Sequence, residues 1–156
     1  MDLKATTTHN TRDIIMRTYT ILFLIISTGL IASIIGYLDY KSLGNMCPQT
    51  IELINCRNVY IIPEARVLGL HLSELAPLYF TTLLATLTLY KLTNTRILLQ
   101  TNILLSITGF TLTPYLIYLE LGVAKALCIY CTIMHISIIG LTITYIYTYK
   151  ELISKQ

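Results

Sequence analysis

The four cysteines are the residues of this chain with the clearest capacity for chemistry. Cys128 and Cys131 form a C-x-x-C motif at the start of the last apolar stretch, and Cys47 and Cys56 lie in one loop that should face it. A C-x-x-C pair closes a small ring. At a helix N-terminus, the exposed N–H groups and the helix dipole lower the pKa of its first thiol. The motif is therefore typical of rapid thiol–disulfide exchange.

Three interpretations of the cysteines are open from the residues alone. Both pairs could be inert disulfides that staple a small bundle. The four sulfurs could instead bind zinc, although the eight residues between Cys47 and Cys56 exceed the usual spacing of two to four. In the third interpretation, which we favour, a mobile loop pair exchanges disulfides with a membrane-embedded pair. We therefore predict Cys47, Cys56, Cys128 and Cys131 as catalytic residues and no metal site.

The composition indicates a membrane protein. The chain has 156 residues, of which 54% are hydrophobic and 12% are charged, whereas soluble domains carry about 25% charged residues. Four apolar runs, at about 18–38, 67–89, 97–119 and 126–149, each reach the roughly 20 residues that a helix needs to cross the hydrocarbon core. We predict an all-α membrane protein with a four-transmembrane-helix bundle. The outer loop 39–66 should cap the active site, and polar tails should occupy 1–17 and 150–156.

Lysine and arginine residues predict the orientation in the membrane. Seven belong to the face with both termini and the turn between the second and third runs, and four to the other face. The positive-inside rule then places both termini in the cytoplasm. The cysteines fall on the extracytoplasmic side of the cell membrane, where disulfides persist. The net charge of +3 follows from this cytoplasmic excess, so no nucleic-acid partner is expected.

Three further residues are candidates for contact with a ligand in the bilayer. His135 follows Cys131 by four residues, so it should lie one turn deeper on the same helix face, where it could donate to a quinone carbonyl or simply bond within the bundle. Glu74 and His71 lie near the outer end of the second run. Ionisable groups within a membrane are functional candidates by default, although Glu74 could also sit at the interface.

The pattern resembles the vitamin K epoxide reductase (VKOR) family in its microbial four-helix form. The order of the cysteine pairs is the reverse of that in DsbB-type thiol oxidases, which argues against that family. The resemblance covers nearly the whole chain after the tail and rests on these segments: Cys47 and Cys56, then Pro63 and Leu68-Gly69, then Tyr115-Leu116 and Tyr118, and finally Ala126-Leu127-Cys128-Ile129-Tyr130-Cys131.

The resemblance implies a membrane thiol:quinone oxidoreductase that generates disulfides. A thioredoxin-fold (DsbA-like) extracytoplasmic partner would reduce the shuttle pair Cys47/Cys56, which would then attack Cys128. Cys131 would be freed as the thiolate that reduces a quinone such as ubiquinone or menaquinone. His135 stands where the family contacts the ring oxygen. The chain shows no fused thioredoxin-like domain, so a separate partner is expected.

Two positions depart from the family pattern, and two other functions stay open. Ile62 replaces the serine that often precedes Pro63, and His71 replaces a common proline. The first alternative function is vitamin K epoxide reduction proper, which uses the same cysteines in the opposite physiological sense. The second is a non-enzymatic membrane bundle with structural disulfides.

Overall fold

A computed structural model of the protein describes residues 3–48, 53–67 and 69–153, with side chains described for 16–48, 53–67 and 69–148. Almost all of its regular structure is helical. The elements, in chain order, are α1 (Leu3–Lys41), α2 (Cys56–Ile61), the 3-10 turn η1 (Pro63–Ala65), β1 (Arg66–Val67), β2 (Leu70–His71), α3 (Leu72–Thr93), α4 (Arg96–Tyr118), the π-helical turn η2 (Leu119–Ala124) and α5 (Ile129–Ile153).

Four helices of the described chain are long and apolar enough to cross a membrane. Their spanning segments are Met16–Lys41, Leu72–Thr93, Arg96–Ala124 and Ile129–Thr148. Many large apolar side chains on these helices are exposed, such as Leu24, Leu104 and Ile136. Lipid tails solvate such side chains as well as a protein core does. The prediction of an all-α bundle with four transmembrane helices is therefore confirmed.

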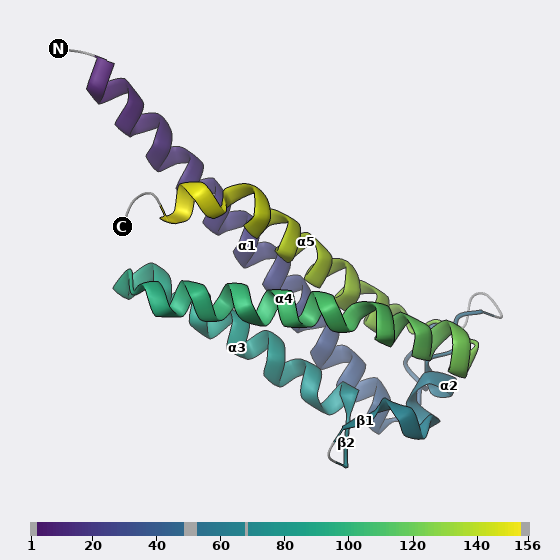
Figure 1. Cartoon of the computed structure of the whole chain (residues 1–156). Helices are drawn as coiled ribbons and strands as arrows, with labels where there is room; N and C mark the ends of the chain where they lie inside the picture. Colours follow the sequence, from purple (N-terminus) through teal and green to yellow (C-terminus); the bar gives the residue numbers. More distant parts are fainter. Residues whose placement is uncertain (1–2, 49–52, 68, 154–156) are drawn as a thin grey trace.

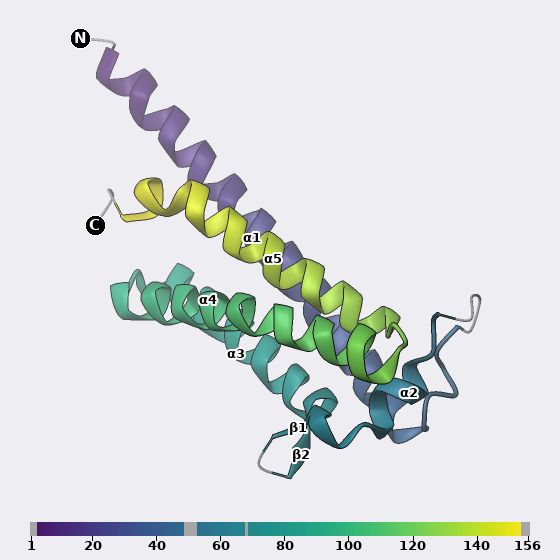
Figure 2. The ribbon, with the colours of Figure 1, turned by 45° about the vertical axis from the view of Figure 1, so that its right-hand side comes forward.

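The four long helices pack in a ring. α1 packs against α3 and α5, and α4 packs against the same two helices. Figures 1 and 2 show α5 running along α1, while α3 and α4 form a hairpin beside them. Both termini lie at the end of the bundle away from α2 (Figure 1). The short elements α2, η1, β1 and β2 thus cover only one end.

The helix bounds differ from the predicted runs where local structure intervenes. α1 begins at Leu3, inside the predicted polar tail, because extending an existing helix is far easier than nucleating one. α3 begins at Leu72 rather than near residue 67, since β1 and β2 first pair as an antiparallel hairpin. α4 runs on into η2, which ends at Lys125 in the left-handed conformation, and α5 consequently begins at Ile129.

Polar and small residues fix the packing of the long helices. The fully buried Asn102 of α4 donates to the Leu83 carbonyl and the Thr86 hydroxyl of α3, both at 2.7 Å, and accepts from the hydroxyl of Tyr145 on α5. At Gly29 of α1, an added Cβ would lie 2.1 Å from a ring carbon of Phe80. Only glycine therefore allows α3 to approach α1 this closely.

Candidate active site

Cys47 and Cys56 are joined in a disulfide bond. Gly44 turns the chain sharply after α1, with φ of 82°, and a Cβ there would collide with Arg57. Cys56 is the first residue of α2, whose N-terminus is capped by Asn55 through a 3.3 Å bond from the N–H of Asn58. Because the two sulfurs bond to each other, this form leaves neither of them as a zinc ligand.

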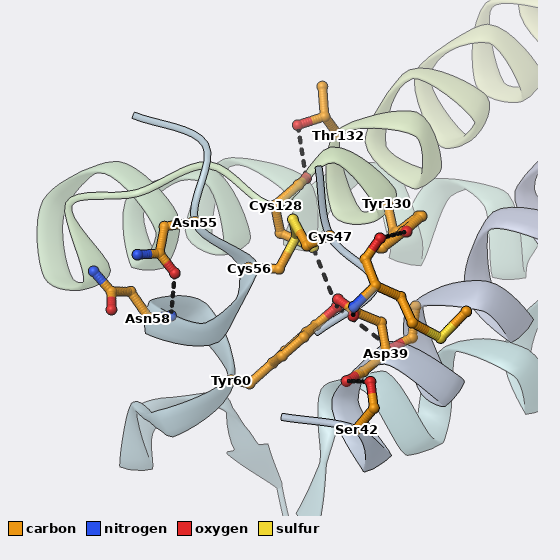
Figure 3. Close-up of a disulfide and its surroundings, with 12 residues drawn as sticks. Asp39, Ser42, Cys47, Asn55, Cys56, Asn58, Tyr60, Cys128, Tyr130 and Thr132 are labelled. Carbon is orange, nitrogen blue, oxygen red and sulfur yellow. Dashed lines mark hydrogen bonds between the residues drawn. A yellow bond between two sulfur atoms is a disulfide. The ribbon is translucent and has the colours of Figure 1, made fainter. Parts of the chain in front are cut away.

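A short backbone pairing brings this disulfide to α5. Residues Ile54 and Leu127 form a parallel bridge. The N–H of Leu127 donates to the Leu53 carbonyl at 2.8 Å, and the N–H of Asn55 donates to the Leu127 carbonyl at 3.1 Å. Cys128 directly follows Leu127, and Cys56 follows Ile54 by two residues. Cys47, Cys56 and Cys128 consequently share one buried cluster (Figure 3).

Cys128 and Cys131 are free thiols at the start of α5. Cys128 precedes the first helical residue, and its carbonyl accepts from the N–H of Thr132 at 2.9 Å. We would expect from the sequence that one of the two cysteines is exposed at the mouth of the site, but Cys128 is fully buried and Cys131 is half-buried. Tyr60 of α2 lies against Cys128 in the same buried cluster.

The surroundings of Cys128 lower the pKa of its thiol to about 7. The largest cause is a hydrogen bond from the Cys131 side chain, and the backbone N–H of Cys131, the hydroxyl of Tyr60 and the backbone N–H of Tyr130 act in the same direction. Burial opposes them, because it disfavours the charged form. The thiolate, which is the reactive form, is therefore more populated at neutral pH than in an ordinary cysteine.

Glu120 is a functional candidate that sequence reasoning missed. Its buried carboxylate accepts from the N–H of Cys128 at 3.2 Å, and its other oxygen lies 3.7 Å from Nδ1 of His135. The π-helical turn η2 and the left-handed Lys125 fold the chain back so that these groups meet. The signal in the sequence was a lone carboxyl group at the end of an apolar run.

Asp39 and Tyr60 were missed as well. Asp39, at the end of α1, is fully buried and accepts from the N–H of Met46 at 2.7 Å and from the Tyr60 hydroxyl at 3.0 Å. The same hydroxyl lies 3.6 Å from Sγ of Cys128 (Figure 3). Burial and the nearby Cys128 sulfur raise the pKa of Tyr60, so the phenol keeps its proton at neutral pH.

A cavity of about 360 Å³ opens beside Cys131. This volume lies within the range of small-molecule pockets, about 300–1,000 Å³. Its wall is formed by α3, α4, α5 and the segment before α3, and most lining side chains are apolar. Seven lining residues carry polar or ionisable groups: His71, Ser73, Tyr79, Thr108, Glu120, Cys131 and His135. The structure thus brings the predicted His71 and His135 to one cavity with the predicted Cys131.

His71 carries an unpaired buried donor and is one of the residues that line this cavity. The side chain is buried, and its Nδ1 accepts from the N–H of Ser73 at 3.1 Å. In a neutral ring the proton then resides on Nε2, which has no hydrogen-bond partner among the described residues. Burial and the positive charge of Arg66 lower the pKa of His71 to about 4, so the ring is neutral at pH 7. Buried N–H groups without a partner are rare, which singles out Nε2 of His71 among the polar atoms near the cavity.

Glu74 lies at the N-terminus of α3 and is not among the residues that line the cavity. Its carboxylate accepts from the backbone N–H of His71 at 3.0 Å and from Nζ of Lys41 at 3.0 Å. These bonds form a capping box with His71 and link α3 to the end of α1. Glu74 therefore positions His71, whereas the sequence had suggested direct contact with a ligand.

Comparison with known proteins identifies the family. The sequence model of the vitamin K epoxide reductase family matches residues 14–152, nearly the whole chain. Comparisons with curated proteins and with solved structures gave no match. Members of this family are membrane helical bundles and oxidoreductases that act on thiols and quinones. The cysteine pairs, the four spanning helices and this match agree, and the chain belongs to the vitamin K epoxide reductase family.

Proposed function

We propose that this protein is a membrane thiol:quinone oxidoreductase that generates disulfides. Electrons enter from a thioredoxin-fold, DsbA-like partner at Cys47/Cys56, pass to Cys128/Cys131 and leave on a quinone. The observation that carries the proposal is the place of the C-x-x-C motif, with Cys128 in the buried cluster of the loop disulfide and Cys131 at the cavity. Cys128 would thus exchange disulfides with the loop pair, and Cys131 would pass electrons to the quinone.

The exchange between the pairs follows from this placement. When the partner has reduced the Cys47–Cys56 bond, one of the two loop thiolates attacks Sγ of Cys128. A new disulfide bond forms to Cys128, the Cys128–Cys131 bond breaks, and the electron pair leaves on Cys131. Attack by the second loop thiol then restores the loop disulfide and frees Cys128. A closed loop disulfide beside two free thiols is the arrangement expected after this transfer.

The residues around the cavity fit a quinone. The apolar wall suits a flat ring with a hydrocarbon tail, and a carbonyl oxygen needs a hydrogen-bond donor. The orphaned Nε2–H of His71 would be such a donor. His135, held 3.7 Å from the Glu120 carboxylate, would be the second polar contact, and this carboxyl group would hold a proton close to the site. A bound quinone would supply the oxidising power by accepting two electrons and two protons.

The arrangement of charges supports an extracytoplasmic position for the cysteines. The cysteine end and the end with the termini lie at opposite ends of the bundle (Figure 1). The excess of lysine and arginine belongs to the end with the termini, which we therefore place in the cytoplasm. A secreted thioredoxin-fold partner would then meet the α2 loop directly from outside the cell membrane.

The test measures quinol formation by the purified protein with a reduced thioredoxin-fold donor. Wild type should reduce ubiquinone or menaquinone, whereas Cys131→Ala should not. Ser137→Ala, which removes a hydroxyl from the same helix, is the matched control, because among the described residues that hydroxyl bonds only to the backbone of Ile133. The absence of quinol formation by folded wild-type protein would sink the proposal. If wild type instead reduces vitamin K epoxide, the opposite physiological direction is favoured.

A further inference from the structure

We propose that Tyr60 and Asp39 form a proton relay between the two cysteine pairs. Asp39 accepts a proton from the loop thiols, and Tyr60 delivers a proton to Cys128. The relay deepens the proposed function and rests on it, since it operates while electrons pass from the loop pair to the C-x-x-C pair. Neither residue belongs to the cysteine motifs, and both are buried.

The relay follows a line of neighbouring polar atoms from the loop sulfurs to Cys128. One carboxylate oxygen of Asp39 and the sulfurs of Cys47 and Cys56 all lie within 4.8 Å of one another. Asp39 Oδ2 accepts from the Tyr60 hydroxyl at 3.0 Å, and that hydroxyl lies 3.6 Å from Sγ of Cys128. Figure 3 shows Asp39 and Tyr60 approaching each other beneath the disulfide and Cys128.

The purely structural role of these two residues accounts for only part of this geometry. Asp39 Oδ1 accepts from the N–H of Met46 at 2.7 Å, which holds the turn after α1. The Tyr60 hydroxyl also lies 3.4 Å from the Gly36 carbonyl, which could satisfy it without a carboxylate. A fully buried carboxylate is costly unless it is well bonded. The relay explains the position of Asp39. Its carboxylate lies between the two loop sulfurs and the Tyr60 hydroxyl, which in turn lies beside Sγ of Cys128.

Protons and electrons balance in this scheme. In the first step, a loop thiol gives its proton to Asp39, its thiolate bonds to Cys128, and Cys131 leaves as a thiolate. In the second step, the other loop thiol attacks the mixed disulfide and gives its proton to Asp39. The proton already on Asp39 passes through the Tyr60 hydroxyl to the departing Cys128 sulfur. The products are a loop disulfide, a Cys128 thiol, a Cys131 thiolate and a protonated Asp39.

The relay prevents charge from accumulating in a buried cluster. Without Asp39, the first step would require a proton to leave the covered site before a thiolate could form, and an unpaired buried charge is strongly disfavoured. With Asp39, the negative charge moves from the carboxylate to the Cys131 sulfur as the proton moves in from the thiol. The total charge of the cluster is the same before and after each step.

The experiment follows the disulfide within the protein. Fully reduced protein receives one equivalent of a soluble quinone, which closes the Cys128–Cys131 pair. Samples are quenched with N-ethylmaleimide, and mass spectrometry shows when the disulfide has moved to Cys47–Cys56. Tyr60→Phe keeps the ring and removes only the oxygen, and Asp39→Asn keeps the size of the side chain. Tyr40→Phe is the matched control, since its ring packs edge-on against that of Tyr60 at 5.7 Å.

Tyr60→Phe and Asp39→Asn should slow the movement of the disulfide by about tenfold or more, within the range of general acid–base effects. The quinone should still close the Cys128–Cys131 pair in both variants, and all rates of Tyr40→Phe should stay as in wild type. Movement at the wild-type rate in folded Tyr60→Phe overturns the relay, and this variant decides alone if Asp39→Asn does not fold. If the quinone leaves Cys128 and Cys131 of wild type reduced, the proposed function fails. In that case diamide is used to oxidise the Cys128–Cys131 pair in wild type and in the same variants, and the movement of the disulfide again tests the relay.

Discussion

Replacement of Cys131 by alanine should raise the pKa of the Cys128 thiol. The hydrogen bond from Cys131 is the largest cause that lowers this pKa to about 7, and burial, which remains in the variant, acts in the opposite direction. An ordinary thiol has a pKa of about 8.5. If the pKa of Cys128 in the variant rises by two thirds of the difference between about 7 and about 8.5, it reaches about 8. The thiolate fraction at pH 7 then falls from about one half to about one tenth.

The assay is the rate of iodoacetamide alkylation of Cys128 as a function of pH, with the Cys47–Cys56 disulfide intact and the product assigned by mass spectrometry. At pH 7 the alanine variant should react about fivefold more slowly than wild type, in proportion to its thiolate fraction. At pH 10 the two rates should coincide, which separates a changed pKa from changed access to a buried sulfur. Cys131→Ser keeps a donor and should keep the midpoint near 7. An unmoved midpoint in Cys131→Ala refutes the assignment.

Two further predictions concern stability. Because the pKa of His71 is about 4 in the folded protein and about 6.5 when unfolded, wild type should lose up to about 3 kcal/mol relative to His71→Asn as the pH falls from 6.5 to 4. Thermal unfolding across this range checks the prediction, and parallel curves would contradict it. Asn102→Leu removes three hydrogen bonds between helices and leaves the buried Tyr145 hydroxyl without this partner. It should therefore lower the free energy of unfolding by about 2–4 kcal/mol. The lipid-facing Thr111→Val is its control, and equal unfolding temperatures for both variants would refute the estimate.

The long apolar runs could be predicted because lipid leaves few alternatives to a helix. The four runs became four spanning helices. Their ends were less predictable, since they depend on local hydrogen bonds. His71 and Glu74 cap α3 through their side chains, and no hydropathy pattern reveals that the preceding apolar residues turn back in a hairpin. Leu3, by contrast, is helical only because a stable helix follows it.

The cysteine pairs could also be found from the sequence, because C-x-x-C spacing encodes its own geometry. The residues that surround the sulfurs could not. Asp39, Tyr60 and Glu120 are 8 to 68 positions from the cysteines they lie beside and reach them through tertiary contacts. Each stands near the end of an apolar run or in the loop, where a polar side chain is usually taken as facing water. Burial alone distinguishes them, and burial is a property of the fold.

Ile62, which replaces the serine that is common in the family, can be explained together with Tyr60. Ile62 is buried and forms part of the apolar cavity wall, so a hydroxyl at this position would add a polar group to this wall. Two residues earlier, on α2, the Tyr60 hydroxyl instead reaches the opposite side of the motif, at Cys128. The chain thereby separates two environments across one turn of α5. In the proposed mechanism, protons are handled at Cys128 through polar groups, and electrons leave Cys131 at a mostly apolar cavity that limits the access of water to the thiolate.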